Sequence, residues 1–317
     1  MSTTEKRSKS DSFFAIIKNL FFVLLILQFL PPMLSSLKTA AEDALYPKAH
    51  VGLLNVSGEI IDPSFYIKKL EEFEKDDDIK ALLLRINSPG GYPGSSQAFF
   101  IELKKFRAKK PVVVLVENIC ASGAYYIAVG ANSIIATPSA LIGSIGVFMG
   151  LPNIKHFMEV WKVYHTYVQS GTYKTVGSMV KDLTADELKY LQVLSDDNYH
   201  QFVKDVAEQR KISATDFKPW ADGKVFTGNQ ALKLKLIDKI GSYHDAIAEI
   251  KTLAKITEEV RLIHPKRQSN IMRLFTGEED FGVEPSSSMA DSVARFASTV
   301  YNKFLVYQAE PAGPSFK

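Results

Sequence analysis

Three segments of this 317-residue chain combine glycine with hydroxyl or amine side chains, and each directly follows a predicted strand. They run from Asn87 to Gly91, from Asn118 to Tyr126 and from Ser170 to Lys174. Glycine lets a backbone approach a ligand closely. Backbone N–H groups of a Gly-Gly turn at a helix entrance form an anion-binding concavity, which suits the oxygen of a tetrahedral intermediate. On local sequence alone, the first segment could equally be a plain tight turn.

The second segment holds a candidate nucleophile, Ser122, at the predicted N-terminus of an apolar helix. Its neighbours Ala121 and Gly123 are small, which leaves its approach open. A helix N-terminus stabilises developing negative charge on a seryl oxygen. The alternative is that Ser122 is only an N-cap, with a contribution of about 1 kcal/mol to stability. We expect Cys120 to be a small buried apolar residue rather than a thiol nucleophile.

A seryl nucleophile needs a base, and the histidines are not obviously placed to supply one. His165 falls within a predicted strand, where a place in the core or in an interface is expected. Lys174 lies in a Gly/Ser loop just past that strand. An ordinary lysine has a pKa of about 10.4, and keeping one neutral near pH 7 takes some 4–5 kcal/mol of differential desolvation. Lys174 could act as a base only in an apolar, largely closed cleft, and otherwise it is a solvated surface charge.

The elements that must position these residues alternate along the chain. Several apolar runs of strand length are apolar at every position, which is typical of strands covered on both faces by helices. The sequence therefore predicts an α/β layered domain. The expected strands are Val51–Val56, Ala81–Ile86, Val112–Val116, Ser133–Ala136 and Val163–Val168, and the expected helices are Ser64–Phe73, Ser95–Phe106, Ser122–Gly130 and Ile154–Trp161.

A long amphipathic helix is predicted from Thr184 to Arg210, where Thr184 and Glu187 have the spacing of a capping box. This helix would form a hairpin or an arm. Short turns and one more helix are expected between Ala221 and Ile250, punctuated by glycines.

Taken together and in this order, the segments resemble the signal peptide peptidase A family, also called protease IV, in its short single-domain form. The resemblance extends from about Lys48 to Ile250 and includes an N-terminal apolar segment. It rests on five motifs: Asn87-Ser88-Pro89-Gly90-Gly91, Ala121-Ser122-Gly123-Ala124-Tyr125-Tyr126, Gly143-Ser144-Ile145-Gly146-Val147, Ser170-Gly171-Thr172-Tyr173-Lys174 and Ala221-Asp222-Gly223-Lys224-Val225-Phe226-Thr227-Gly228.

The resemblance implies a role for each matching residue. Ser122 would be the nucleophile, and Lys174 would be the general base. The backbone amides of Gly91 and Gly123 would form the oxyanion hole, and the Ser144 hydroxyl would orient the lysine. The implied reaction is hydrolysis of apolar peptides, such as remnant signal peptides left after preprotein processing, without a metal or another cofactor.

The implied fold is that of the Clp protease and crotonase superfamily, with repeated ββα units, and members of the family assemble into rings. One departure is visible, because the family commonly has Gly where this chain has Ala124. That position is one residue past the implied oxyanion amide. We expect the helix turn to be retained and the pocket to be slightly narrower.

The N-terminal region predicts a membrane anchor at residues 13–34, about 33 Å long as a helix. Lys6, Arg7 and Lys9 precede it, so the positive-inside rule places the N-terminus in the cytoplasm and the body outside it. The alternative is a signal peptide cleaved near the small residues 39–41. The resemblance then implies a single-pass protein of the bacterial plasma membrane.

The predicted organisation has five parts. A cytoplasmic N-terminus covers residues 1–12, the anchor 13–34, a linker 35–47, a peptidase domain 48–264 and a C-terminal extension 265–317. The extension contains one amphipathic stretch, Ala290–Tyr307, whose role the sequence leaves open.

Composition narrows the remaining classes of function. With 38 basic and 35 acidic residues, the net charge of +3 argues against a surface that binds nucleic acid. A single cysteine excludes an internal disulfide framework and a Cys-rich zinc site. Two rival functions remain: an inactive membrane scaffold, disfavoured by the intact Ser122, Lys174 and Ser144, and a crotonase-type acyl-CoA enzyme, which leaves Lys174 without a role.

Overall fold

The computed structural model describes residues 48–265 without a break. Before them it describes only residues 18–24, 26–28, 30–31, 33–34 and 38. No helix among these residues combines the length and apolarity needed to cross a bilayer. The cytoplasmic N-terminus 1–12, much of the anchor 13–34 and of the linker 35–47, and the extension 265–317 apart from Pro265 lie outside the described residues, as does Ala290–Tyr307. These assignments stay predictions.

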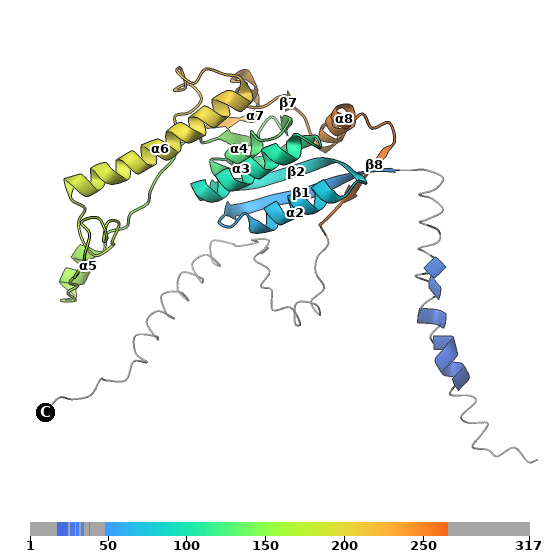
Figure 1. Ribbon diagram of the computed structural model, residues 1–317, viewed down its shortest axis with the longest axis horizontal. Helices are drawn as coiled ribbons and strands as arrows, with labels where there is room; N and C mark the ends of the chain where they lie inside the picture. Colours follow the sequence, from blue (N-terminus) through green and yellow to red (C-terminus); the bar gives the residue numbers. More distant parts are fainter. Residues whose placement is uncertain are drawn as a thin grey trace, which may run out of the picture.

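An eight-stranded sheet forms the centre of the body (Figure 1). Its neighbours run in the order β6-β5-β3-β2-β1-β8, with β4 between β3 and β7. All pairings are parallel except that of β5 with β6. The strands are β1 (Lys48–Ile60), β2 (Ile79–Gly91), β3 (Val112–Ala121), β4 (Ser133–Ala136), β5 (Leu141–Gly143), β6 (Val225–Thr227), β7 (Lys239–Ile240) and β8 (Glu259–Ile263).

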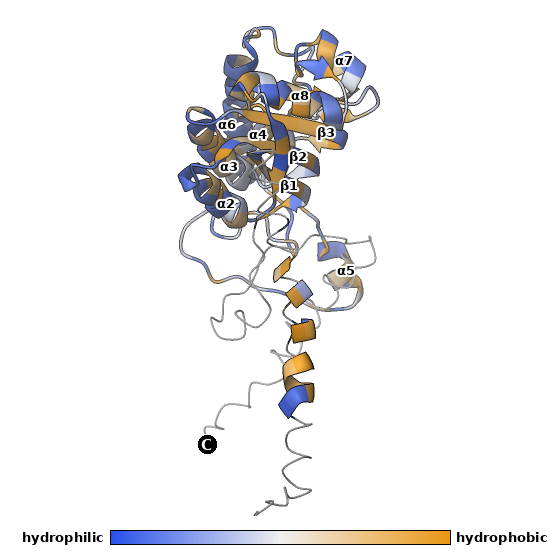
Figure 2. Cartoon of the chain, turned by 90° about the vertical axis from the view of Figure 1, so that its right-hand side faces the viewer, coloured by the Kyte–Doolittle hydropathy of each residue, from blue (hydrophilic) through white to orange (hydrophobic). Residues whose placement is uncertain are grey.

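Helices cover both faces of this sheet. The helices of the described body are α2 (Ser64–Lys75), α3 (Pro93–Arg107), α4 (Gly123–Ala128), α5 (Lys155–Val160), α6 (Ala185–Arg210), α7 (Gly228–Lys233) and α8 (Tyr243–Ala254), of which α5 lies away from the sheet (Figure 1). Leu82 and Leu84 pack into the larger core, which includes residues of α2, α3, α4 and α6. Leu83 points the other way, into a smaller core with Ala246 and Ile250 of α8. This alternation explains why the central strands are apolar at every position (Figure 2).

The α/β class predicted from the sequence is confirmed. Four of the five expected strands lie within β1 to β4, and the expected helices before residue 162 correspond to α2, α3, α4 and α5. The strand expected at Val163–Val168 is wrong, because that segment is an exposed irregular loop. Its β-branched and aromatic residues favour a strand only where a neighbouring strand can pair with them, and none of the described strands does so. The Clp and crotonase assignment stays a prediction.

The long helix α6 has the expected capping box. The Thr184 side chain accepts a hydrogen bond from the Glu187 backbone, and the Glu187 carboxylate accepts one from the Thr184 backbone. Its second half packs on the body through Phe202, Val203 and Val206, which are buried. Its first half extends away from the sheet, with α5 beyond its start (Figure 1). The predicted arm is therefore present.

Candidate active site

Ser122 lies between β3 and α4 in a backbone conformation that residues with a side chain rarely adopt, with φ of 53° and ψ of −126°. Its N–H donates a 2.7 Å hydrogen bond to the Gly143 carbonyl, which fixes the turn. Although Ser122 occupies the N-cap position of α4, its side chain makes no capping hydrogen bond. The interpretation of Ser122 as only an N-cap is therefore wrong. A strained residue of this kind costs about 1–3 kcal/mol and is typical of functional sites.

The surroundings of Ser122 hold it in place. Every residue of α4 is buried, and Tyr125 donates a 2.7 Å hydrogen bond from its hydroxyl to the Leu236 carbonyl. Cys120 is fully buried, as expected, and burial raises the pKa of its thiol above the ordinary value. A thiol kept protonated is a poor nucleophile. Ser122 itself is half-buried, so its side chain is more accessible than that of Cys120.

The two glycine segments meet beside Ser122. A Cβ built on Gly91 would lie 2.1 Å from the Ile60 carbonyl oxygen, and one built on Gly123 would lie 2.2 Å from Ser96 Oγ and 3.2 Å from the Gly91 nitrogen. Position 91 therefore requires glycine, position 123 has room for a side chain only if Ser96 moves, and the two backbones are adjacent. The Gly123 N–H belongs to the first turn of α4, where helix N–H groups have no partner within the helix. The structure thus brings Gly91, Ser122 and Gly123 together, as the sequence predicted.

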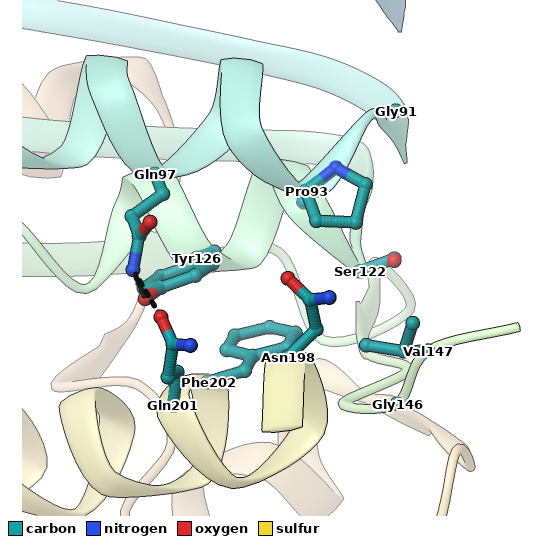
Figure 3. Close-up of a pocket in the computed structure, with 11 residues that line it drawn as sticks. Gly91, Pro93, Gln97, Ser122, Tyr126, Gly146, Val147, Asn198, Gln201 and Phe202 are labelled. Carbon is teal, nitrogen blue, oxygen red and sulfur yellow. Dashed lines mark hydrogen bonds between the residues drawn. The ribbon is translucent and has the colours of Figure 1, made fainter. Parts of the chain in front are cut away.

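A small cavity of about 30 Å³ opens next to Ser122 (Figure 3). Tyr126 and Phe202 stack with ring centroids 4.5 Å apart along one side of it. Gln97 donates hydrogen bonds of 3.1 Å to the Tyr126 hydroxyl and to Gln201 Oε1. This volume exceeds what one water needs, about 10–15 Å³, but leaves room only for a small group.

The Tyr126 hydroxyl also donates a hydrogen bond to Asp205 on α6. Burial, with the hydrogen bond and charge of Asp205, raises the pKa of Tyr126, so the hydroxyl stays protonated. This network ties α3, α4 and α6 into one wall of the cavity.

Helix α6 also lines this cavity, through Asn198, Gln201 and Phe202, and the sequence did not predict this. The amphipathic pattern predicts the helix but not which part of the body its apolar side covers. No local signal in these three residues indicates a site.

The structure does not bring Lys174 to Ser122 within the chain. Lys174 lies exposed in the segment between α5 and α6, its N–H donating to the Gly171 carbonyl at 3.2 Å, and it does not line the cavity. Figure 1 shows that segment beyond the start of α6, away from α4. Ser144 is nearer, because it follows Gly143, and its N–H donates to the Lys224 carbonyl at 2.8 Å. His165 is exposed and lies against Tyr167, so the expectation of a place in the core is wrong, whereas the alternative of a place in an interface stays a prediction.

Within the part of the chain that the structure describes, no group of three or more His, Cys, Asp or Glu side chains could hold a metal ion. The site itself combines a serine hydroxyl with adjacent backbone amides.

Comparison with known proteins identifies the family. Residues 104–257, which include Ser122 and Lys174, match Peptidase family S49. "Putative protease slr0021" of Synechocystis sp. is 37% identical over 225 residues, which are 71% of this chain and 80% of that protein. The chain belongs to peptidase family S49. Two more relatives are "Putative protease MJ0651" of Methanocaldococcus jannaschii, 38% identical over 62% of this chain, and "Protease 4" of Salmonella typhi, 34% identical over 60% of it.

These S49 relatives differ from this chain in length. The matched region is 63% of the Methanocaldococcus protein and 31% of the Salmonella protein. The family resemblance drawn from the sequence motifs is confirmed, and the motif residues from Ala121 to Lys174 lie inside the S49 match.

Proposed function

We propose that this member of family S49 is a serine endopeptidase with Ser122 as nucleophile and Lys174 as general base. The observation that carries the proposal is the Ser122 turn. Its hydroxyl caps no helix, its backbone is strained, and it lies beside the backbones of Gly91 and Gly123. Strain at a residue with an uncommitted hydroxyl is expected where function, not stability, determines the conformation.

The proposed reaction has two steps. The neutral amine of Lys174 takes the proton of the Ser122 hydroxyl as the oxygen attacks a peptide carbonyl, and the Gly91 and Gly123 amides donate to the oxyanion. The lysine ammonium then gives its proton to the leaving amine, which leaves an acyl ester on Ser122. In the second step the neutral Lys174 amine takes a proton from water as the water oxygen bonds to the ester carbon, and the ammonium returns that proton to Ser122 Oγ as the ester bond breaks. Apart from the peptide and water, this scheme uses only groups of the protein.

We propose that a neighbouring copy of the chain supplies Lys174, in a ring. The segment that carries Lys174 exposes large apolar side chains, each between 63% and 102% exposed: Phe148, Phe157, Trp161, Tyr164 and Val168. Exposed apolar surface of this extent is typical of an interaction surface. A partner that covers it would also exclude water from the lysine, and an apolar surrounding favours the neutral amine that the reaction needs.

The proposed substrates are apolar peptides, among them remnant signal peptides, cleaved by a protein anchored at residues 13–34. Support comes from the family, the apolar N-terminal segment and the aromatic side of the cavity. The cavity of about 30 Å³ next to Ser122 suits a small side chain such as that of alanine beside the scissile bond.

The test is hydrolysis of a quenched apolar peptide by the full chain in detergent, as wild type, Ser122→Ala and Lys174→Ala. Each variant should lose at least about 10³-fold in rate, since members of a catalytic unit are each needed for turnover. Ser170→Ala, an exposed serine of the same segment as Lys174, is the matched control and should retain the wild-type rate. Unchanged hydrolysis by Ser122→Ala would refute the nucleophile, and an inert but assembled wild type would favour the scaffold.

A further inference from the structure

A second hollow, of about 530 Å³, lies at the other ends of the helices that form the Ser122 cavity. Gln97 on α3 lines the first cavity and Arg107 the second, about 15 Å apart at the helical rise. On α6, Gln201 lines the first and Lys211, the residue after the helix, lines the second. The second hollow is therefore separate from the site of the proposed reaction.

The hydrogen-bond acceptors around this hollow are already engaged. Its one carboxylate, Asp238, accepts two hydrogen bonds from Arg210, of 2.8 and 3.0 Å, and one of 2.7 Å from the Ile134 N–H. The Ala131 carbonyl accepts from Arg107 at 2.9 Å. Asn132 Oδ1 accepts from the Val112 N–H at 2.8 Å. The negative charge of Asp238 is therefore neutralised by Arg210 and is not available to bind a cation in the hollow.

The donors around the hollow are in excess. Arg107 uses one N–H for the Ala131 carbonyl and one for Gln209 Oε1, so part of its five-donor guanidinium remains available. The Asn132 side-chain N–H₂ group makes no hydrogen bond among the described residues. Lys211 and Lys235 are exposed and form no ion pair within residues 48–265. Once Arg210 is paired with Asp238, three cationic side chains remain without a carboxylate partner lining the hollow.

One of these cations, Arg107, is half-buried. Burial lowers the pKa of its guanidinium below the ordinary value, and the negative charge of Glu208 opposes this shift. A half-buried cation in this state gains from an anion brought next to it. The free donors come from separate parts of the chain, namely the end of α3, the loop before β4, the end of α6 and the turn after α7.

We propose that this hollow binds a phosphate group through Arg107, Asn132, Lys211 and Lys235. A tetrahedral phosphate offers several acceptor oxygens in different directions, which suits donors converging from four parts of the chain. A carboxylate has two oxygens in one plane and would reach fewer of them. The same chemistry is available from free phosphate or a phosphate monoester and from the headgroup of an anionic phospholipid.

The test is titration calorimetry of the full chain in a neutral detergent at constant ionic strength. Inorganic phosphate represents the soluble source, and dihexanoyl phosphatidylglycerol below its micelle concentration represents the lipid source. Acetate and dihexanoyl phosphatidylcholine are the reference ligands. The test variant is Lys211→Gln combined with Lys235→Gln. The matched control is Lys189→Gln combined with Lys204→Gln, which removes the same charge from exposed lysines of α6 outside the hollow.

Saturable binding of phosphate or of the phosphatidylglycerol by wild type and control, weakened at least about tenfold in the test variant, supports the site and identifies its source. No saturable binding of either probe overturns the proposal. Equal binding by test and control variants, or equal binding of acetate, also overturns it. Exposed lysine substitutions change stability by only about ±0.5 kcal/mol, so both variants should fold. Their peptide hydrolysis should match wild type, which separates this proposal from the proposed function.

Discussion

Ser122 illustrates how a backbone angle can distinguish two interpretations that composition leaves open. A serine before an apolar helix is commonly an N-cap, and such a residue has extended backbone and a side chain bonded to the helix. Thr184 and Thr227 in this chain have both properties. Ser122 has neither property: its φ is positive, its side chain makes no capping hydrogen bond, and the residue lines the cavity. The sequence predicted the residue, whereas only the structure shows that its hydroxyl is uncommitted.

Gly123 provides a prediction at the residue scale. In Gly123→Ala the new Cβ would lie 2.2 Å from Ser96 Oγ and 3.2 Å from the Gly91 nitrogen, so the two amides proposed to bind the oxyanion should separate. Loss of one such donor costs roughly 10²–10³ in rate. We therefore expect hydrolysis of the quenched peptide to fall by at least about 100-fold, measured as kcat.

A second substitution tests the steric cause. Ser96 is buried and its hydroxyl has no partner among the described residues, so Ser96→Ala removes no hydrogen bond. In the double variant Gly123→Ala with Ser96→Ala, the shortest contact at the Gly123 Cβ lengthens to 3.1 Å, and part of the rate should return. Gly94→Ala, where a Cβ meets nothing within 4 Å, is the control. A double variant no faster than Gly123→Ala alone would argue against the clash.

At the scale of elements, the parts of the site that could be predicted are those attached to neighbouring parallel strands. Gly91 ends β2, and Ser122 with Gly123 follows β3, its neighbour in the sheet. Carboxyl ends of adjacent parallel strands meet at one edge, so strand prediction already brings these residues together. The α6 wall could not be predicted in this way, because nothing in a helix's own sequence specifies which distant surface it covers.

The position of Lys174, in contrast, was not predicted correctly from the expected strands. The strand expected at Val163–Val168 would have brought Lys174 to that same edge, but the structure has no strand there. Residues such as Val163 and Tyr164 favour a strand, but this preference depends on neighbouring side chains that pack against them. Within the described chain, both side chains are exposed and so have few such neighbours. The β-branched and aromatic residues of this segment are therefore as compatible with packing against another molecule as with forming a strand.

The capping box of α6 gives a prediction about pH. The hydrogen bond from Lys181, and then that from the Thr184 backbone, lower the pKa of Glu187 below its ordinary value. A lowered pKa means that the ionised form is favoured in the folded protein, so this stabilisation is present above the unfolded value of about 4.3 and is lost as pH falls through the folded value. Glu187→Gln should therefore melt below wild type at pH 7, and the gap in Tm should narrow between pH 5 and pH 3.

The control for this prediction is Asp186→Asn, one residue earlier on α6. Asp186 is exposed, and its side chain forms no hydrogen bond or ion pair with another residue of 48–265. Its Tm difference from wild type should stay small across the same pH range. A gap for Glu187→Gln that does not change with pH would show that the carboxylate charge contributes nothing to the cap.

The whole molecule has two unlike regions. The sheet and its helices form a closed core, whereas the segment from Phe148 to Lys174 leaves aromatic and aliphatic side chains exposed. Large apolar side chains exposed together in one segment are typical of an interaction surface. The proposed nucleophile belongs to the first region and the proposed base to the second, so the catalytic unit would be completed by assembly. In a ring, each interface is heterologous and every copy can offer its segment to the next.

Complementation between two inactive variants tests this arrangement. Ser122→Ala and Lys174→Ala chains, each with a different affinity tag, are expressed together, and assemblies with both tags are isolated by two purification steps. If each site combines the serine of one copy with the lysine of the next, a random assembly has intact pairs at about a quarter of its interfaces. We expect hydrolysis of the quenched peptide to return to about a quarter of the wild-type rate per chain. The Ser122→Ala chain expressed with a chain that carries both substitutions should stay inactive, because no intact serine is present. If isolated mixed assemblies of the two single variants are also inactive, while their wild-type counterpart is active, serine and lysine pair within one chain and the α5–α6 segment must move to reach its own cavity.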